Sequence, residues 1–96
     1  MDKQEAIREQ IEEALQKPEI PALYFNGFSN VLGAGDVLIV LTRNGAPLAV
    51  LNASYTVAKT FAMKLQDIIA NLENATGNTI MTVDEVEQKI TVKQEP

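Results

Sequence analysis

Two short groups of residues could hold a charged ligand, and each fits a simpler structural role. The run Gly33-Ala34-Gly35 resembles the start of a phosphate-binding loop, but no Lys-Ser or Lys-Thr pair follows it, and the next residues are typical of a strand. We therefore predict a turn at residues 33–36. The acidic group Asp84, Glu85 and Glu87 lacks the glycine and the alternating oxygen ligands of an EF-hand. We predict that it begins a helix, because a helix N-terminus favours negative charge.

Nucleophilic catalysis has little support in this sequence. Ser54 has no histidine or neighbouring lysine to activate it, so its expected role is to cap the start of a helix. The chain contains no cysteine and no histidine, which excludes disulfides and thiolate sites and removes the commonest general base and metal ligand. We therefore expect a protein that is not an enzyme, with no catalytic residue, no cofactor and no metal site.

Three polar residues form the remaining candidate site. Tyr24, Asn26 and Asp36 flank the first expected strand and the turn into the second. Asn26 and Asp36 can satisfy the backbone groups of a turn or a bulge, as asparagine and aspartate commonly do. Alternatively, the three residues form the rim of a groove that binds a peptide or a subunit.

The composition restricts the class of protein. With 96 residues, 22% of them charged and 46% hydrophobic, the chain has room for one globular domain. Its net charge is -5 and its basic residues are scattered singly, so we expect neither a nucleic-acid partner nor a membrane partner. Residues 1–5 are polar and no apolar run approaches the ~18 residues of a membrane span, which predicts a cytoplasmic location.

The longest periodic segment predicts one amphipathic helix over residues 54–77. Ser54 can cap its start, and Gly77 supplies the left-handed residue that ends it. A lone helix of this length would be marginally stable in water. Burying four of its large apolar side chains would contribute roughly 6 to 12 kcal/mol, so we expect the helix to lie on a sheet. The apolar stripe consists of Val57, Ala58, Phe61, Ala62, Leu65, Ile68, Ile69 and Leu72.

An antiparallel sheet of at least three strands is expected before this helix. Residues 22–31 predict the first strand, in which Gly27 indicates a bulge or a close backbone contact. Residues 37–43 and 46–53 predict two more strands, joined by Asn44-Gly45 in a two-residue type I′ hairpin. That turn sets Arg43 opposite Ala46 and puts Pro47 in a pair that is not hydrogen-bonded, where its missing N–H is harmless.

Both faces of this hairpin are apolar. Leu41, Leu48, Ile39 and Val50 share one face, and Leu38, Leu51, Val40 and Ala49 share the other. The long helix can cover only one face, so we expect the N-terminal helix or another copy of the protein to cover the other. The expected interface residues are Ile7, Ile11, Leu15, Leu38, Val40, Ala49 and Leu51.

The two ends of the chain complete the expected organisation. Residues 2–16 predict a helix with a narrow apolar seam, followed by a proline-rich linker that ends at Pro21. After Gly77, a capping box at Thr82 to Glu85 favours a short helix, although residues 79–83 and 90–93 would also fit short strands. We expect one α+β domain over residues 1–96, in which the sheet packs on the long helix: helix and linker at 1–21, sheet-plus-helix core at 22–80, and tail at 81–96.

The order of several of these residues resembles a bacterial family called domain of unknown function thirty-four sixty-seven. The resemblance covers about residues 24–80 and is most specific from Ala58-Lys59 to Gly77-Asn78-Thr79-Ile80; it departs at Tyr55, where the family has proline, and in the added first helix. It implies a small sheet followed by one long helix, with no activity or cofactor. In strand order, acidity and lack of cysteine alone, the chain is also similar to a bacterial export chaperone family that holds unfolded polypeptides.

These observations predict a non-enzymatic, self-associating protein–protein interaction module, present as a homo-oligomer of two or more copies. The alternative is a chaperone-like protein that binds extended or unfolded polypeptide segments on an apolar sheet face.

Overall fold

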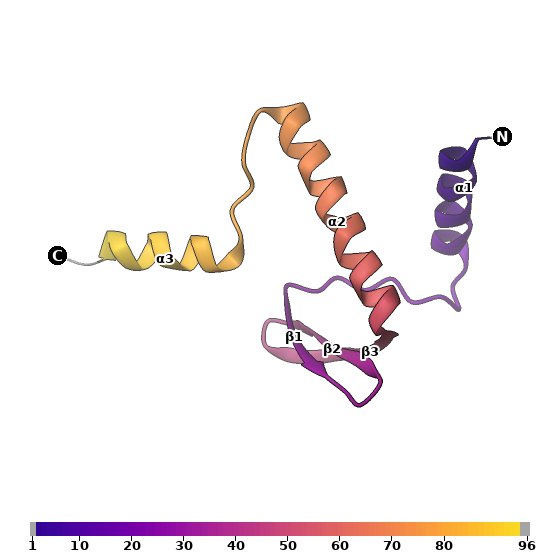
Figure 1. Ribbon diagram of the computed structural model, residues 1–96, viewed down its shortest axis with the longest axis horizontal. Helices are drawn as coiled ribbons and strands as arrows, with labels where there is room; N and C mark the ends of the chain where they lie inside the picture. Colours follow the sequence, from indigo (N-terminus) through magenta and orange to yellow (C-terminus); the bar gives the residue numbers. More distant parts are fainter. Residues whose placement is uncertain (1, 95–96) are drawn as a thin grey trace. The chain divides into compact units, whose positions relative to one another are not determined.

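The computed structural model describes residues 2–94 of the chain (Figure 1). In chain order its elements are α1 (Lys3–Gln16), β1 (Gly27–Leu32), β2 (Asp36–Arg43), β3 (Ala46–Ser54), α2 (Tyr55–Thr76) and α3 (Val83–Gln94). The strands form one antiparallel sheet in the order β1-β2-β3. The predicted α+β class, the N-terminal helix, the three-stranded sheet and the long helix are therefore confirmed.

The described chain divides into two compact units. The first consists of the residues up to Gly33 together with Leu38–Asn52, and it holds α1 and most of the sheet. The second consists of Ala34–Val37 together with the residues from Ala53 onward. It holds α2, α3 and the ends of β2 and β3 that lie farthest from the hairpin turn.

The turn between β2 and β3 lies at the predicted dipeptide. Asn44 and Gly45 both have positive φ angles, 52° and 84°, as a type I′ turn requires. A two-residue loop leaves Arg43 and Ala46 as the last and first residues of the two strands. The predicted hairpin is confirmed. The turn predicted at residues 33–36 is confined to residues 33–35, because Asp36 already begins β2.

The first strand begins later than its side chains suggest. The predicted strand covered residues 22–31, whereas β1 runs from Gly27 to Leu32 and the residues before Gly27 form no strand. Asn26 N donates to Thr42 O at 3.1 Å, so Asn26 already lies opposite the penultimate residue of β2. Residues farther back would face the hairpin turn, which offers no strand to pair with. The prediction was wrong at this end because pairing needs a partner strand.

Gly27 is required by a close approach across the sheet. A Cβ atom added at Gly27 would lie 2.5 Å from Thr42 Oγ1, closer than two such atoms can pack. The sequence predicted a bulge or a close backbone contact here. The structure has a close contact, made by the Thr42 side chain and the backbone of Gly27.

Local hydrogen bonds cap the helices, and those of α2 lie where the sequence predicts them. Ser54 Oγ accepts from Val57 N at 3.2 Å at the start of α2, and Gly77 ends that helix with a φ of 71°. Asp2 Oδ1 accepts from Glu5 N at 2.8 Å and caps α1. The C-terminal segment is the helix α3 rather than short strands, so the favoured interpretation of that segment is confirmed and the alternative is wrong.

Candidate functional site

Two of the candidate rim residues lie beside the hairpin turn. Asn44 N donates to Asn26 Oδ1 at 2.8 Å, and Asn26 Nδ2 donates to Asn44 Oδ1 at 2.9 Å. The guanidinium carbon of Arg43 lies 5.7 Å from the centre of the Tyr24 ring, within the range of a cation–π contact. The segment before β1 is therefore attached to the hairpin turn by an amide pair and a stacked cation.

This arrangement supports the structural role of Asn26. Its side-chain oxygen satisfies the backbone N–H of the first turn residue, and its side-chain nitrogen is bonded to the same residue. Sequence reasoning had included Tyr24 and Asn26 but had missed Arg43 and Asn44 as their partners. The Asn-Gly dipeptide marked the turn, but no sequence pattern marked the residue 18 positions earlier that binds it.

Asp36 is not brought to this cluster. It is the first residue of β2, and Arg43 is the last, so about 23 Å of extended strand separates them at about 3.3 Å per residue. Asp36 is half-buried. The three predicted rim residues therefore lie near the two ends of one strand, and they do not surround a single groove.

The two groups of residues that could hold a charged ligand have structural roles instead. Gly33, Ala34 and Gly35 join two strands, so the loop does not lead into the helix that a phosphate-binding loop needs. Glu85 Oε1 accepts from both the N–H and the hydroxyl of Thr82 at 3.0 Å, and Glu85 N donates to Thr82 Oγ1 at 3.3 Å. This is a capping box, and it accounts for an acidic residue at the start of α3.

The Thr82 hydrogen bonds shift the titration of Glu85. The hydrogen bond from the Thr82 backbone N–H, followed by the one from its hydroxyl, holds the pKa of Glu85 below its ordinary value of 4.5, and the charge of Lys89 acts in the same direction. Among residues 2–94, no group of three or more acidic side chains, the one around Glu85 included, is arranged so that it could hold a metal ion.

The apolar surface is the most extensive candidate for function. Leu41, which is 7% exposed, is the one buried hydrophobic residue in the described part of the chain. Of the expected interface residues, Ile7, Ile11, Leu15 and Leu51 are exposed, with Leu15 at 70%, while Leu38, Val40 and Ala49 are half-buried. On the other face of the hairpin, Leu48 and Val50 are exposed and Ile39 is half-buried.

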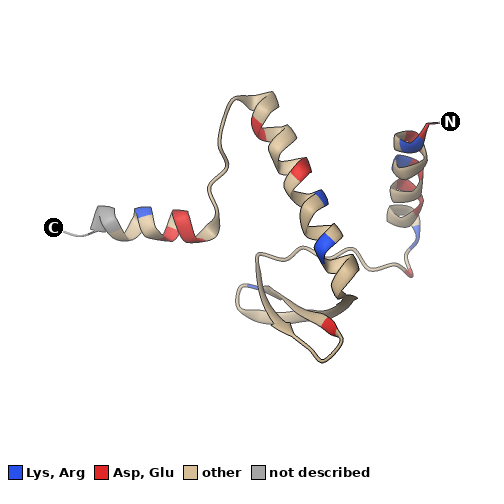
Figure 2. Ribbon diagram, in the orientation of Figure 1, with Lys and Arg blue, Asp and Glu red and all other residues tan. Residues whose placement is uncertain are grey.

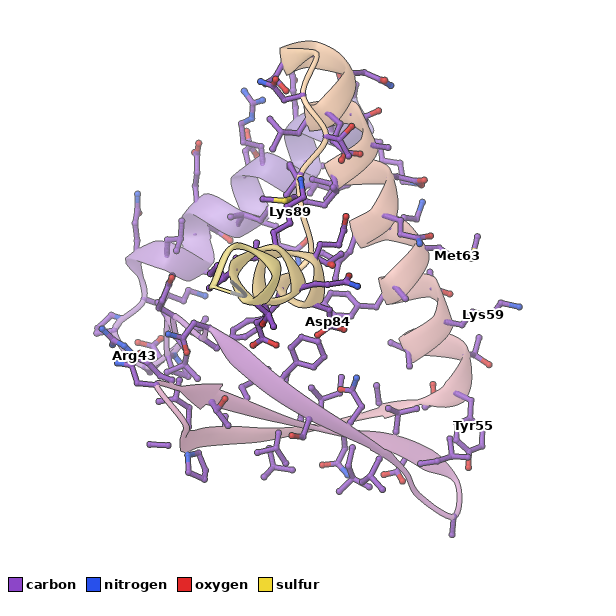
Figure 3. The ribbon with its side chains drawn as sticks, turned by 90° about the vertical axis from the view of Figure 1, so that its left-hand side faces the viewer. Arg43, Tyr55, Lys59, Met63, Asp84 and Lys89 are labelled. Atoms are coloured by element: carbon purple, nitrogen blue, oxygen red, sulfur yellow. The ribbon has the colours of Figure 1, made fainter. Side chains whose placement is uncertain are left out.

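The longest apolar surface belongs to α2, which the predicted interface did not include. No residue of α2 is buried, and Ile68 in the middle of its stripe is 62% exposed. Tyr55, Lys59 and Met63 lie along one side of the helix (Figure 3), and at 3.6 residues per turn this side lies about 80–160° from Leu65. The periodic apolar residues of α2 were evident in the sequence, but they had been expected to pack against the sheet. Among the described residues, no helix combines the length and the apolar content needed to cross a membrane.

Comparisons with known proteins add no relative. No protein-family model, no curated protein and no solved structure matches this chain significantly.

Proposed function

We propose that this chain is a non-enzymatic module that associates with copies of itself. The observation that supports the proposal is the exposure of regular apolar seams on its helices. Ile7, Ile11 and Leu15 form such a seam on α1, and the stripe of α2 is longer. Contiguous apolar patches larger than a few hundred Å² are rare on proteins that work as monomers and mark sites of association.

The resemblance to the bacterial family of unknown function belongs to this proposal and adds no activity to it. The proposal also keeps the expected cytoplasmic location. The charge distribution favours a protein partner over nucleic acid, because the blue ribbon segments that mark Lys and Arg in Figure 2 are separated along the chain rather than gathered on one element.

Light scattering coupled to size exclusion tests self-association directly. The chain has a mass of 10.5 kDa, so we expect a species of at least two chain masses at micromolar concentration. The mass should fall on dilution if the subunits exchange. A mass of one chain across the whole concentration range would contradict the proposal.

One observation favours the alternative, a chaperone-like protein that binds extended segments. The strands β1 and β3 are the two edges of the sheet, and neither Gly27–Leu32 nor Ala46–Ser54 contains a charged residue. Uncharged edges can accept an extended peptide as an additional strand. Suppression of the aggregation of an unfolded model protein would support this alternative. An oligomer that closes its apolar surface on itself should give no suppression.

A further inference from the structure

Apart from Val57, whose counterpart is Glu73, the apolar stripe of α2 is symmetric about Leu65. Ala58 and Leu72 lie seven residues before and after it, Phe61 and Ile69 lie four, and Ala62 and Ile68 lie three. At 3.6 residues per turn, all of these side chains lie within about 60° of the direction of Leu65. The stripe therefore presents nearly the same apolar pattern when α2 is read in either direction.

We propose that this face of α2 binds the same face of a second copy, antiparallel, with the twofold axis passing at Leu65. The inference rests on the proposed self-association and specifies where it occurs. A twofold interface uses one patch twice, so the patch must be complementary to itself. The symmetric stripe meets this condition, because Ala58 of one copy lies opposite the partner subunit's Leu72, and small residues face large ones at both ends.

The charges of α2 favour the antiparallel orientation. Lys59 and Lys64 lie in its first half, and Asp67 and Glu73 lie in its second half (Figure 2). In the antiparallel pair, Lys59 lies within about 3 Å along the axis of the partner subunit's Glu73. Lys59 and Glu73 lie on the same flank of the stripe, and an antiparallel pair brings the same flanks of its two helices together.

A parallel pair would have the opposite electrostatics. It would gather the four lysines at one end of the helix pair and the four acids at the other, and it would align the two helix dipoles. The Glu73 carboxylate is also held near the end of α2, because its Oε2 accepts from Ile80 N at 2.7 Å. The acid that would meet Lys59 of the second copy is therefore fixed in place by its own chain.

The stripe is large enough for a specific interface. Phe61, Leu65, Ile68, Ile69 and Leu72 are all exposed. At about 25 cal/mol per Å² and about 1.5–3 kcal/mol per side chain, each can bury about 60–120 Å². Five residues from each of two copies then bury about 600–1,200 Å² before the flanking residues are counted, and a specific interface needs about 1,000 Å².

Single engineered cysteines in the full chain test the site and its orientation, since the natural chain has none. Leu65→Cys should form a disulfide across the twofold axis under mild oxidation. Met63→Cys is the control, since residue 63 lies about 3 Å from residue 65 along the helix axis but about 160° around it. At about 10 μM protein, an effective concentration of about 1 mM predicts that Leu65→Cys crosslinks about 100-fold faster than Met63→Cys. Equal rates would overturn the proposal.

A second pair of variants tests whether the two α2 helices are antiparallel, independently of the Leu65 substitution. Ala58→Cys alone should not crosslink, because two copies of residue 58 would be about 21 Å apart in the antiparallel pair. A mixture of Ala58→Cys and Leu72→Cys should give the mixed disulfide. Crosslinking of Ala58→Cys with itself, without the mixed disulfide, would show a parallel pair and overturn the proposal.

The mass of the reduced variants separates this inference from the proposed function. If the chains associate but residue 65 crosslinks no faster than residue 63, then self-association stands and the site on α2 is wrong. In that case the sheet of the same chain, or another surface of the partner, covers the stripe. A chain that remains a monomer before oxidation would overturn both proposals.

Discussion

Asn26 and Asn44 bind each other through a reciprocal pair of hydrogen bonds, 2.8 Å from the Asn44 backbone nitrogen to Asn26 Oδ1 and 2.9 Å between the two side chains. The pair attaches the residue before β1 to the first residue of the hairpin turn. Asn26 N also donates to Thr42 O at 3.1 Å. These bonds fix the end of the sheet at which β2 turns back into β3.

Replacing Asn26 with alanine should loosen this end of the sheet. Two side-chain hydrogen bonds at an exposed site, at about 0.5–1.5 kcal/mol each, predict a loss of about 1–3 kcal/mol in the free energy of unfolding. Urea denaturation measures the change. Asn30→Ala, at an exposed asparagine within β1, is the matched control and should change stability by less than about 0.5 kcal/mol. Equal losses in the two variants would show that the amide pair contributes nothing.

Replacing Gly27 with alanine should also destabilise the sheet, for a steric reason. The added Cβ would lie 2.5 Å from Thr42 Oγ1, so either the Thr42 side chain or one of the two strands must shift. We expect a loss of about 1–3 kcal/mol, as for other overpacked sites. The double variant Gly27→Ala with Thr42→Ala removes the clashing oxygen and should recover part of the loss. Additive losses in thermal unfolding would contradict this explanation.

Gly77→Ala should destabilise the end of α2. Gly77 has a φ of 71°, and a side chain in this left-handed region costs about 1–2 kcal/mol. Gly35→Ala is the control, because Gly35 has no positive φ and a Cβ added there would meet nothing within 4 Å. The control should leave the midpoint of thermal unfolding unchanged or slightly raised. A similar decrease in both variants would contradict the assignment.

The stability of α3 should fall in acid. The Thr82 hydrogen bonds hold the folded-state pKa of Glu85 below its ordinary value of 4.5, so the ionised form is stabilised in the folded chain. The contribution is therefore fully present above pH 4.5 and is lost as the pH falls through the lower, folded-state pKa.

An NMR titration of the Glu85 side-chain carboxyl measures this shift. Thr82→Ala should raise the Glu85 pKa towards its ordinary value because it removes the hydroxyl donor. Thr91→Ala is the control within the same helix, since the Thr91 hydroxyl donates to Glu87 O instead. A Glu85 pKa that does not change in Thr82→Ala would show that the hydroxyl plays no part.

The features that sequence reasoning located correctly depend on chemistry within a few residues. Asn44-Gly45 can form its turn with little help from distant residues, and Ser54, Gly77 and the Thr82–Glu85 box satisfy groups of their own helices. The start of β1 was misplaced because it depends on where β2 ends. The partner of Asn26 was missed for the same reason, since it lies 18 residues away along the chain.

Association through α2 is tested most directly by the mass of three chains in solution. Leu65→Lys places two like charges at the twofold axis, and Met63→Lys adds the same charge on another side of the helix. Sedimentation equilibrium at micromolar concentration should give at least two chain masses for the natural chain and for Met63→Lys, and one chain mass for Leu65→Lys. A natural chain of one chain mass, or a Leu65→Lys variant as heavy as the natural chain, would contradict the account.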